Sequence, residues 1–316
     1  MTQSQHIGLA RSSEVTFVGV DWGTTHRRAY ALDASGKCIR SHADSDGALA
    51  CKGRFAQALH AALQALDAHP QRVLMSGMVG SAMGWKEAPY LDASVALTDM
   101  PQHLMLIPDD SDPAPRSVVP GYCIRNQWGQ PDVMRGEETQ LLGAVTLGHH
   151  TGWFVLPGTH SKWVELKAGR IVHLRTYMTG ELFNLLSKNG TLAAAAGSGE
   201  PVWDAAVFAQ GVQAAQHGAL SHLLFECRAR VVCGDMPASS TSAYLSGLLI
   251  GSELHDVVQG ASAARAVSPV KIIGSPELAQ HYQTAATPLG LAFEVIDAQD
   301  AFLGAMTHFQ FHGRSA

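Results

Sequence analysis

Two short turns carry residue types that bind phosphate. The first, Asp21-Trp22-Gly23-Thr24-Thr25, follows a run of β-branched and aromatic residues that begins at Val15. Glycine lets a ligand approach the backbone, and threonine hydroxyl and N–H groups donate to phosphate oxygens. Asp21 can hold Mg²⁺ directly or through water. An ordinary hairpin with turn-forming residues is the alternative for this stretch taken alone.

A second turn of the same kind, Gly158-Thr159-His160-Ser161, follows the strand-like residues Trp153–Leu156. Both turns lead into a returning strand, a short glycine turn and a third strand, which indicates a duplicated supersecondary unit. Two such hairpins, one in each of two domains, would clamp a polyphosphate. The second strand ends in Leu156 where the first ends in Asp21, so we expect a metal ion at the first turn alone.

Acidic residues begin two of the expected helices. Gly136–Leu147 reads as a helix with Glu137 and Glu138 in its first turn, and Glu181 lies near the start of another. Acidic residues in a first turn commonly complement the helix dipole. A base that takes a proton from an acceptor hydroxyl would occupy the same place, so both interpretations stay open.

Two further segments could contact a ligand. A glycine-rich loop, Gly77–Lys86, follows the strand expected at Arg72–Ser76, and ligands bind beyond the carboxyl ends of strands in open α/β sheets. A flexible connection is the alternative. Gly274-Ser275 joins a strand to a helix that begins at Pro276, and such a helix start can accept a phosphate or an adenine. The candidate contacts in the loop are Gly77, Met78, Gly80, Ser81, Trp85 and Lys86.

The elements that must position these groups alternate between strands and helices. Apolar spacing and punctuation predict strands at Arg28–Asp33 and Cys38–His42, helices at Arg54–Ala68, Trp203–Gly218 and Ser239–Leu254, a short strand at Arg230–Cys233, and a final helix, Asp297–Phe309, capped by Asp297. Asp99–Pro120 has five prolines and an acidic run, which predicts a loop.

Composition narrows the class of protein. The chain has 316 residues, 46% hydrophobic and 16% charged, as in a globular protein of one large or two medium domains. A net charge of -5 with scattered basic residues argues against a nucleic-acid or anionic-membrane partner. No apolar stretch reaches the ~20 residues of a membrane helix. Met1–Ser13 lacks a signal-peptide pattern, and five cysteines without a C-x-x-C pair favour reduced thiols, so we expect a cytoplasmic protein.

Several familiar enzyme motifs are missing from the sequence. It contains no G-x-x-x-x-G-K-[ST], no G-x-G-x-x-G after a strand and no G-x-S-x-G. Two phosphate turns, one metal-holding carboxylate, a helix start with carboxylates and a late Gly-Ser turn together predict phosphoryl transfer from a nucleoside triphosphate. An ATP-driven switch with a protein partner and an inactive sugar-binding regulator are the alternatives. The short chain and the loop at Gly77–Lys86 favour a kinase.

The combined motifs resemble those of the 2-dehydro-3-deoxygalactonokinase family, which belongs to the actin, hexokinase and sugar-kinase superfamily. They are D-W-G-T-T (Asp21–Thr25), S-G-M-V-G-S (Ser76–Ser81), R-G-E-E-T-Q (Arg135–Gln140), P-G-T-H-S-K-W (Pro157–Trp163) and Y-M-T-G-E-L-F (Tyr177–Phe183). The resemblance implies phosphorylation of the terminal hydroxyl of 2-dehydro-3-deoxy-D-galactonate by ATP and Mg²⁺. The 6-phosphate product would feed an aldolase of galactonate breakdown. A related sugar acid, such as the gluconate epimer, is the alternative substrate.

The resemblance also assigns roles to residues. The matching phosphate motifs are Asp21, Gly23, Thr24 and Thr25, and Gly158, Thr159, His160 and Ser161, with Asp21 as the metal ligand and Gly274 and Ser275 as the adenosine turn. His160 differs from the small residue common elsewhere in the superfamily. Glu138 is preferred as the base, with Glu137 close behind. Arg135 and Glu181 join the substrate contacts, and the cations that could meet the substrate carboxylate are Arg28, Lys86, Arg125, Arg135 and Lys162.

The fold implied by the resemblance is α/β, a two-domain actin-like ATPase (ribonuclease H-like) fold with mixed sheets flanked by helices and a cleft between the domains. We expect a substrate and phosphate domain at 1–147 and a nucleotide-binding domain at 148–296. The helix at 297–309 would pack back on the first domain. Hinge closure around the substrate would exclude water. A homodimer is possible.

Overall fold

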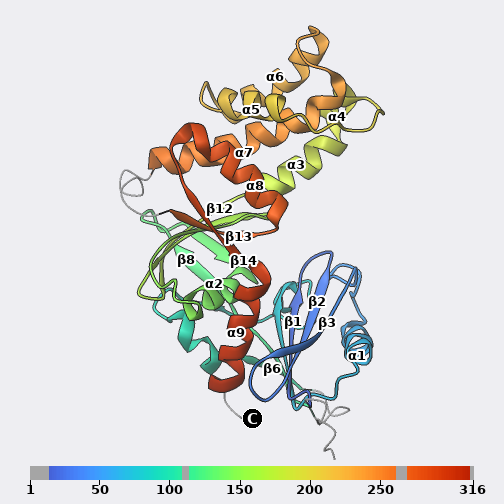
Figure 1. The fold of residues 1–316 in the computed structure, drawn as a ribbon, viewed down its shortest axis with the longest axis vertical. Helices are drawn as coiled ribbons and strands as arrows, with labels where there is room; N and C mark the ends of the chain where they lie inside the picture. Colours follow the sequence, from blue (N-terminus) through green and yellow to red (C-terminus); the bar gives the residue numbers. More distant parts are fainter. Residues whose placement is uncertain (1–13, 109–113, 261–268, 314–316) are drawn as a thin grey trace, which may run out of the picture. The chain divides into compact units, whose positions relative to one another are not determined.

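The computed structural model describes residues 14–108, 114–260 and 269–313 (Figure 1). The chain forms two compact units. Unit 1 comprises Met1–Cys123, Val133–Gly148 and Gln299–Ala316, and unit 2 comprises Ile124–Asp132 and His149–Ala298. Each unit is built around one mixed sheet.

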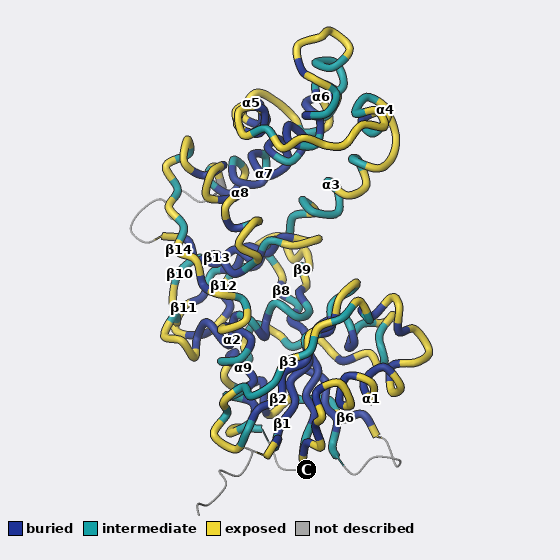
Figure 2. The backbone as a smooth tube through the Cα atoms, turned by 45° about the vertical axis from the view of Figure 1, so that its right-hand side comes forward, coloured by how far each residue is buried: buried dark blue, intermediate teal, exposed yellow. Residues whose placement is uncertain are grey.

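The sheet of unit 1 has six strands in the order β3-β2-β1-β4-β7-β6. Its strands are β1 (Phe17–Trp22), β2 (Arg27–Leu32), β3 (Cys38–Asp44), β4 (Arg72–Gly77), β6 (Met105–Ile107) and β7 (Arg116–Val118). The strand β1 pairs antiparallel with β2 and parallel with β4, so a hairpin and a crossover meet at β1. Figure 2 shows β1 and β2 as largely buried backbone.

Two helices cover opposite faces of this sheet because side chains alternate along β1. Val18 and Val20 share a core with Phe55 and Leu59 of α1 (Phe55–Ala65). The other face meets α9 (Ala298–His312), where the Cβ of a residue at Gly19 would lie 2.5 Å from the Met306 side chain. The helix α2 (Glu137–Thr146) packs so closely on α9 that Gly143 has no room for a side chain.

Unit 2 repeats this arrangement. Its sheet has the order β12-β11-β10-β13-β14, in which β10 pairs antiparallel with β11 and parallel with β13. The strands are β10 (Gly152–Leu156), β11 (Ser161–Lys167), β12 (Arg170–Tyr177), β13 (Val270–Gly274) and β14 (Phe293–Asp297). The duplication predicted from the two Gly-Thr turns is therefore confirmed.

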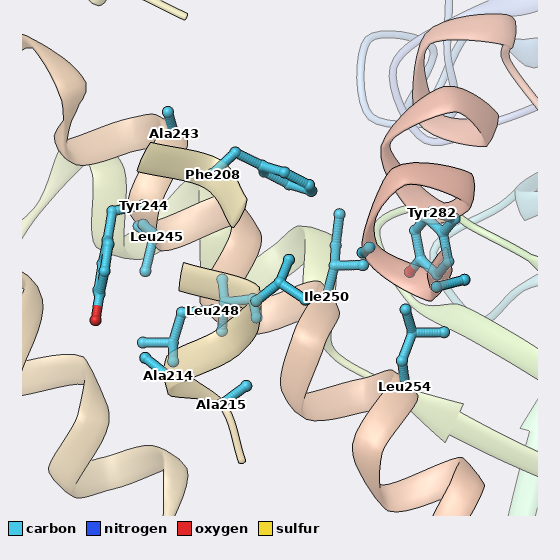
Figure 3. Close-up of a cluster of buried hydrophobic side chains, with 14 of the residues drawn as sticks. Phe208, Ala214, Ala215, Ala243, Tyr244, Leu245, Leu248, Ile250, Leu254 and Tyr282 are labelled. Atoms are coloured by element: carbon cyan, nitrogen blue, oxygen red, sulfur yellow. The ribbon is translucent and has the colours of Figure 1, made fainter. Parts of the chain in front are cut away.

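The helices of unit 2 pack largely around α7. They are α3 (Thr179–Lys188), α4 (Gly190–Ala196), α5 (Ala205–Ala214), α6 (Leu220–Val232), α7 (Thr241–Gly260) and α8 (Pro276–Ala286). Figure 3 shows the cluster in which Leu248, Ile250 and Leu254 of α7 lie with Phe208 of α5 and Tyr282 of α8. This cluster holds α8, and so the turn before it, against α7.

The structure corrects two predictions of secondary structure. Asp99–Pro120, predicted to be a loop, contributes β6 and β7 to the sheet of unit 1, while its acidic run at 109–112 lies outside the described residues. Arg230–Cys233, predicted to be a strand, is the end of α6, which stops before Gly234 at φ +81°. The strands β5 (Tyr90–Leu91), β8 (Gly121–Arg125), β9 (Pro131–Met134) and β14 were not predicted.

All five cysteines are free thiols, as the sequence predicts. Within the described ranges, none of the helices is both long enough and apolar enough to cross a membrane.

Candidate functional site

The first turn and the glycine-rich loop leave the sheet of unit 1 at the same edge. Parallel pairing of β1 and β4 sets Asp21 opposite Ser76 and Trp22 opposite Gly77, so the residues that follow both strands emerge side by side. Gly77 has φ +94°, and a Cβ there would lie 2.7 Å from the Trp22 carbonyl oxygen. This conformation and this close approach both require glycine.

The loop Gly77–Lys86 is folded by hydrogen bonds of its own. Its first residues form a 3-10 turn, Met78–Gly80, and the Trp85 N–H donates to the Val79 carbonyl at 2.8 Å. The Ser81 hydroxyl donates to the Met78 carbonyl at 2.8 Å. These bonds fix the conformation of the loop, which argues against the alternative of a flexible connection. The Lys86 side chain at the end of the loop is exposed.

The start of α2 lies at the same edge. The Ser76 and Thr139 hydroxyl oxygens are 2.6 Å apart, and a Cβ on Gly136 would lie 3.2 Å from the Cα of Gly77. The structure therefore brings the carboxylates of α2 next to the ends of β1 and β4. These contacts are all within unit 1.

The two glutamates of α2 have different surroundings. Glu138 is fully buried, and both its carboxylate oxygens accept from the Gly136 N–H, at 2.9 and 2.7 Å. Burial, with the nearby Glu137 charge second, raises the pKa of Glu138 to about 8. Glu137 is partly exposed, and its carboxylate accepts from the Arg135 N–H at 3.0 Å. One carboxyl group is thus shielded and protonated near neutral pH, while its neighbour meets solvent.

Arg135 joins this helix start to the loop region. Its Nη2 donates to the Ala88 carbonyl at 2.7 Å, its guanidinium lies 4.4 Å from the centre of the Tyr90 ring, and its Nη1 lies beside Gly80. Its Nε and Nη1 atoms have no hydrogen-bond partner among the described residues. Both atoms are buried. Arg135 is nevertheless the candidate cation that lies beside both the loop and the start of α2.

Two other candidate cations donate hydrogen bonds to residues of unit 2. Lys162 is buried in unit 2 and donates to the Thr176 hydroxyl at 2.9 Å, and Arg125 donates to the Gly129 carbonyl at 2.8 Å. Neither lies in unit 1, where the loop and the glutamates are found.

Asp21 is suited to a metal ion whose other ligands are water molecules and phosphate oxygens. Its side chain is 28% exposed and lies 3.2 Å from Arg28 Nη1. Burial raises the pKa of Asp21, and the Arg28 charge acts in the opposite direction. The described residues hold no group of three or more potential metal ligands. Mg²⁺ commonly uses one carboxylate with phosphate and water oxygens, so a lone Asp21 fits this ion.

The turn that follows Asp21 is held in place by hydrogen bonds from the backbone of Ala48 and Leu49. The Ala48 N–H donates to the Gly23 carbonyl at 2.9 Å, and the Leu49 N–H donates to the Thr24 carbonyl at 3.2 Å. Thr24 is partly exposed and Thr25 is exposed. The backbone is therefore fixed while donors of the turn stay accessible.

The second turn, in unit 2, is similarly held against the start of α3. Gly158, Thr159 and His160 are exposed, and the Glu181 N–H donates to the Thr159 carbonyl at 2.9 Å. A Cβ on Gly180 would lie 2.2 Å from the Gly158 carbonyl oxygen, so glycine is required there. His160 Nε2 lies 2.5 Å from Glu181 Oε2. Glu181 thus belongs to unit 2, whereas the other proposed substrate contacts belong to unit 1.

The Gly274-Ser275 turn lies beside the second phosphate turn. The strand β13 ends at Gly274 parallel to β10, and a Cβ on Gly274 would lie 3.3 Å from the Pro157 ring. The Ser275 hydroxyl accepts from the Leu278 N–H at 3.3 Å and so caps α8. Two turns at the carboxyl ends of neighbouring parallel strands suit the phosphate and adenosine parts of one nucleotide.

One polar residue of this region was missed from the sequence. Glu253 is buried in α7 and accepts hydrogen bonds from Ser161, the last residue of the second turn, and from Thr179 at the start of α3. It belongs to no motif, and its one signal is an acidic residue within the apolar helical stretch Ser239–Leu254.

Each unit has a mixed sheet with a Gly-Thr hairpin. The chain therefore has the actin-like ATPase fold, which is also the fold of sugar kinases. A solved structure of that fold, the activator of 2-hydroxyisocaproyl-CoA dehydratase from Clostridium difficile with bound ADPNP, aligns at a TM-score of 0.51 with 12% identity over 95% of this chain and 96% of that one. The family model for 2-keto-3-deoxy-galactonokinase matches residues 21–309, and the chain belongs to this family.

Relatives of the chain carry the same enzyme name. "Probable 2-dehydro-3-deoxygalactonokinase DgoK1" of Rhizobium meliloti is 35% identical over 90% of this chain and 93% of its own length. The 2-dehydro-3-deoxygalactonokinase of Escherichia coli is 33% identical over 90% and 94%. A crystal structure from Sinorhizobium meliloti, assigned to the same enzyme, aligns at a TM-score of 0.83 with 33% identity and covers 93% of this chain and 95% of that one.

Proposed function

We propose that the protein transfers the γ-phosphoryl group of ATP to the terminal hydroxyl of 2-dehydro-3-deoxy-D-galactonate and so forms the 6-phosphate. Membership of the family and the names of its relatives support this substrate. The observation that carries the proposal is the Glu137–Glu138 pair at the start of α2, next to the ends of β1 and β4. A base at that point serves a kinase that has an acceptor hydroxyl.

Phosphoryl transfer depends mainly on positioning and on neutralising charge. Thr24, Thr25 and the backbone of the first turn would bind phosphate oxygens, as would Gly158–His160 in unit 2. The Gly274-Ser275 turn would receive the adenosine. Asp21 would hold Mg²⁺, which supplies positive charge to the phosphates.

The base should be ionised and within reach of the substrate hydroxyl. Glu137 meets the condition of reach better, because its side chain is partly exposed, whereas Glu138 is buried with a pKa of about 8. We therefore assign the base to Glu137. Glu138, preferred from the sequence, becomes the alternative, since a group with a pKa near the working pH can also accept a proton.

The substrate is a sugar acid, so its carboxylate needs a cation. Arg135 is the choice, because a planar guanidinium suits a carboxylate and this one is already fixed beside the loop by Ala88 and Tyr90. Gly77, Met78, Gly80, Ser81, Trp85 and Lys86 would line the rest of the substrate site. The cytoplasmic location and the homodimer also stay predictions.

The test is ADP release by the purified protein with ATP and Mg²⁺, with and without the galactonate compound. The gluconate epimer and plain hexoses are run in parallel. We expect strong stimulation by 2-dehydro-3-deoxy-D-galactonate alone and a phosphorus NMR signal from a phosphate ester on its terminal hydroxyl oxygen. Stimulation mainly by another acid would correct the substrate, and ADP release indifferent to every sugar would instead indicate an ATP-driven switch with a protein partner.

The same assay assigns the base. Glu137→Gln should lower kcat about 10²–10⁴-fold, the usual contribution of a general base. Glu138→Gln is the matched control, because it makes the same chemical change one residue along. A large loss in Glu138→Gln with little loss in Glu137→Gln would move the base to Glu138.

A further inference from the structure

A buried carboxylate in unit 2 collects hydrogen bonds from several elements. Glu253 of α7 is 2% exposed. Its Oε1 accepts from Ser161 Oγ at 2.7 Å and Trp163 Nε1 at 2.6 Å, and its Oε2 accepts from Tyr282 Oη at 2.8 Å and from Thr179 Oγ1. Four side-chain donors thus converge on one carboxylate.

Three of these donors belong to segments proposed to hold the nucleotide. Ser161 ends the second phosphate turn. Thr179 is the first residue of α3, whose Gly180 packs on that turn. Tyr282 is on α8, the helix that Ser275 caps, and Figure 3 shows it in the same cluster as Leu254 of α7. Glu253 therefore connects all three segments to α7.

The carboxylate does not face the proposed ligand. Gly158, Thr159 and His160 are exposed, whereas Ser161 is fully buried and its hydroxyl donates to Glu253. A negative charge beside a polyphosphate would weaken binding, so direct contact cannot explain this group. Burying a carboxylate is costly unless several donors satisfy it, and removing it would leave those donors without their acceptor.

We propose that Glu253 is a positioning residue for the nucleotide. It holds the Gly158–Ser161 turn, the start of α3 and α8 in the arrangement that receives the phosphates. The inference rests on the proposed function, because it takes the Gly158–Ser161 turn to be a phosphate site. It concerns ATP and not the sugar acid. Glu181 contacts Thr159 and His160 of the second turn and is grouped with the nucleotide side, and the remaining proposed sugar contacts belong to unit 1.

The test compares Glu253→Gln with Leu248→Val. Leu248 is fully buried on the same helix and is not one of the four donors to Glu253, so its variant reports the loss of packing without the loss of a hydrogen bond to the carboxylate. ATP affinity is measured by calorimetry, and KM is measured separately for ATP and for the sugar acid. We expect Glu253→Gln to weaken ATP binding and raise the KM for ATP by about tenfold or more, as for loss of charge-assisted hydrogen bonds. The KM for the sugar acid should change less than about twofold on the same grounds.

The outcomes separate this inference from the proposed function. If the unaltered protein does not bind ATP, the proposed function fails. If it binds ATP and Glu253→Gln binds equally well, or if Leu248→Val raises the KM for ATP as much, the positioning role is wrong. Should Glu253→Gln not fold, Thr179→Val and Tyr282→Phe each remove one donor. Both should weaken ATP binding while the KM for the sugar acid holds, and unchanged ATP binding in both would overturn the inference.

Discussion

The pH dependence of the free energy of unfolding should show that Glu138 is a buried carboxyl group that stays protonated in the folded protein. The pKa of Glu138 is about 8 in the folded chain, against a usual value of 4.5. Between these values the folded state keeps a proton that the unfolded state releases, so the free energy of unfolding falls as pH rises. For this shift, the loss between pH 5 and pH 8 is about 3–4 kcal/mol.

Glu138→Gln should remove this contribution. The amide stays neutral at every pH and keeps one oxygen to accept from the Gly136 N–H. We therefore expect the unaltered protein to lose about 3–4 kcal/mol more stability than the variant over this pH range. Urea unfolding at intervals of half a pH unit measures the difference, and other titrating groups cancel in the comparison.

Glu137→Gln is the control, since its charge is the second cause of the raised pKa of Glu138. Its stability should still fall with pH, with a slightly smaller total because the like charge is gone. Parallel curves for the unaltered protein and Glu138→Gln would show that Glu138 ionises normally and would refute the reasoning. If Glu138→Gln lost more stability than the unaltered protein as the pH rises, the pKa of Glu138 would have to be lowered by folding and not raised.

Three further predictions concern other parts of unit 1. Gly143→Ala should lower the free energy of unfolding by about 2–3 kcal/mol in a urea titration, because its Cβ would lie 1.5 Å from the Ala301 carbonyl oxygen. Arg135→Lys should raise the KM for the sugar acid about tenfold and leave that for ATP unchanged, since an ammonium cannot reproduce a bidentate contact. Asp21→Asn should increase the Mg²⁺ concentration that gives half-maximal activity by about tenfold or more, because an amide is a weaker ligand for this ion than a carboxylate; an unchanged Mg²⁺ requirement would remove Asp21 from the metal site.

Much of the fold could be predicted because its signals are local. The β-branched run before Asp21, the glycine turns and the apolar spacing of α1 each specify an element within about ten residues. The repeated Gly-Thr hairpin then indicated that two such units exist. The parallel pairing of β1 with β4 agrees with the long connection between them, which runs through β2, β3 and α1.

The wrong predictions came from segments whose structure depends on distant neighbours. The strand β7 has three buried residues, Arg116–Val118, between Pro115 and Pro120, and it exists because it pairs with β4 on one side and β6 on the other. Arg230–Cys233 has the β-branched pair of a strand, yet it continues the helix that begins at Leu220. For β7 the tertiary pairing outweighs local propensity, whereas Arg230–Cys233, with Val232 71% exposed, follows the helix that precedes it.

The two buried glutamates show why the site itself was only partly predictable. Sequence motifs identified Glu138 through its neighbours, but its protonation depends on burial and on the adjacent Glu137 charge. Glu253 has no motif, because its four donors come from β11, α3 and α8 and meet only after folding. Motifs therefore find residues on ligand-binding turns, whereas residues that support those turns become visible in three dimensions.

The contrast between the two carboxyl groups also bears on the proposed mechanism. Glu138 accepts from the backbone N–H groups of Gly136 and Glu138 and from the Thr139 hydroxyl, but complete burial beside a second acid outweighs them, so it keeps its proton. The nearby Glu137 charge is the second cause of the raised pKa of Glu138, so a neutral Glu138 avoids like charges on adjacent residues at a helix start. Glu137 is the member of the pair that solvent reaches, so it is the carboxyl group that a terminal hydroxyl can approach.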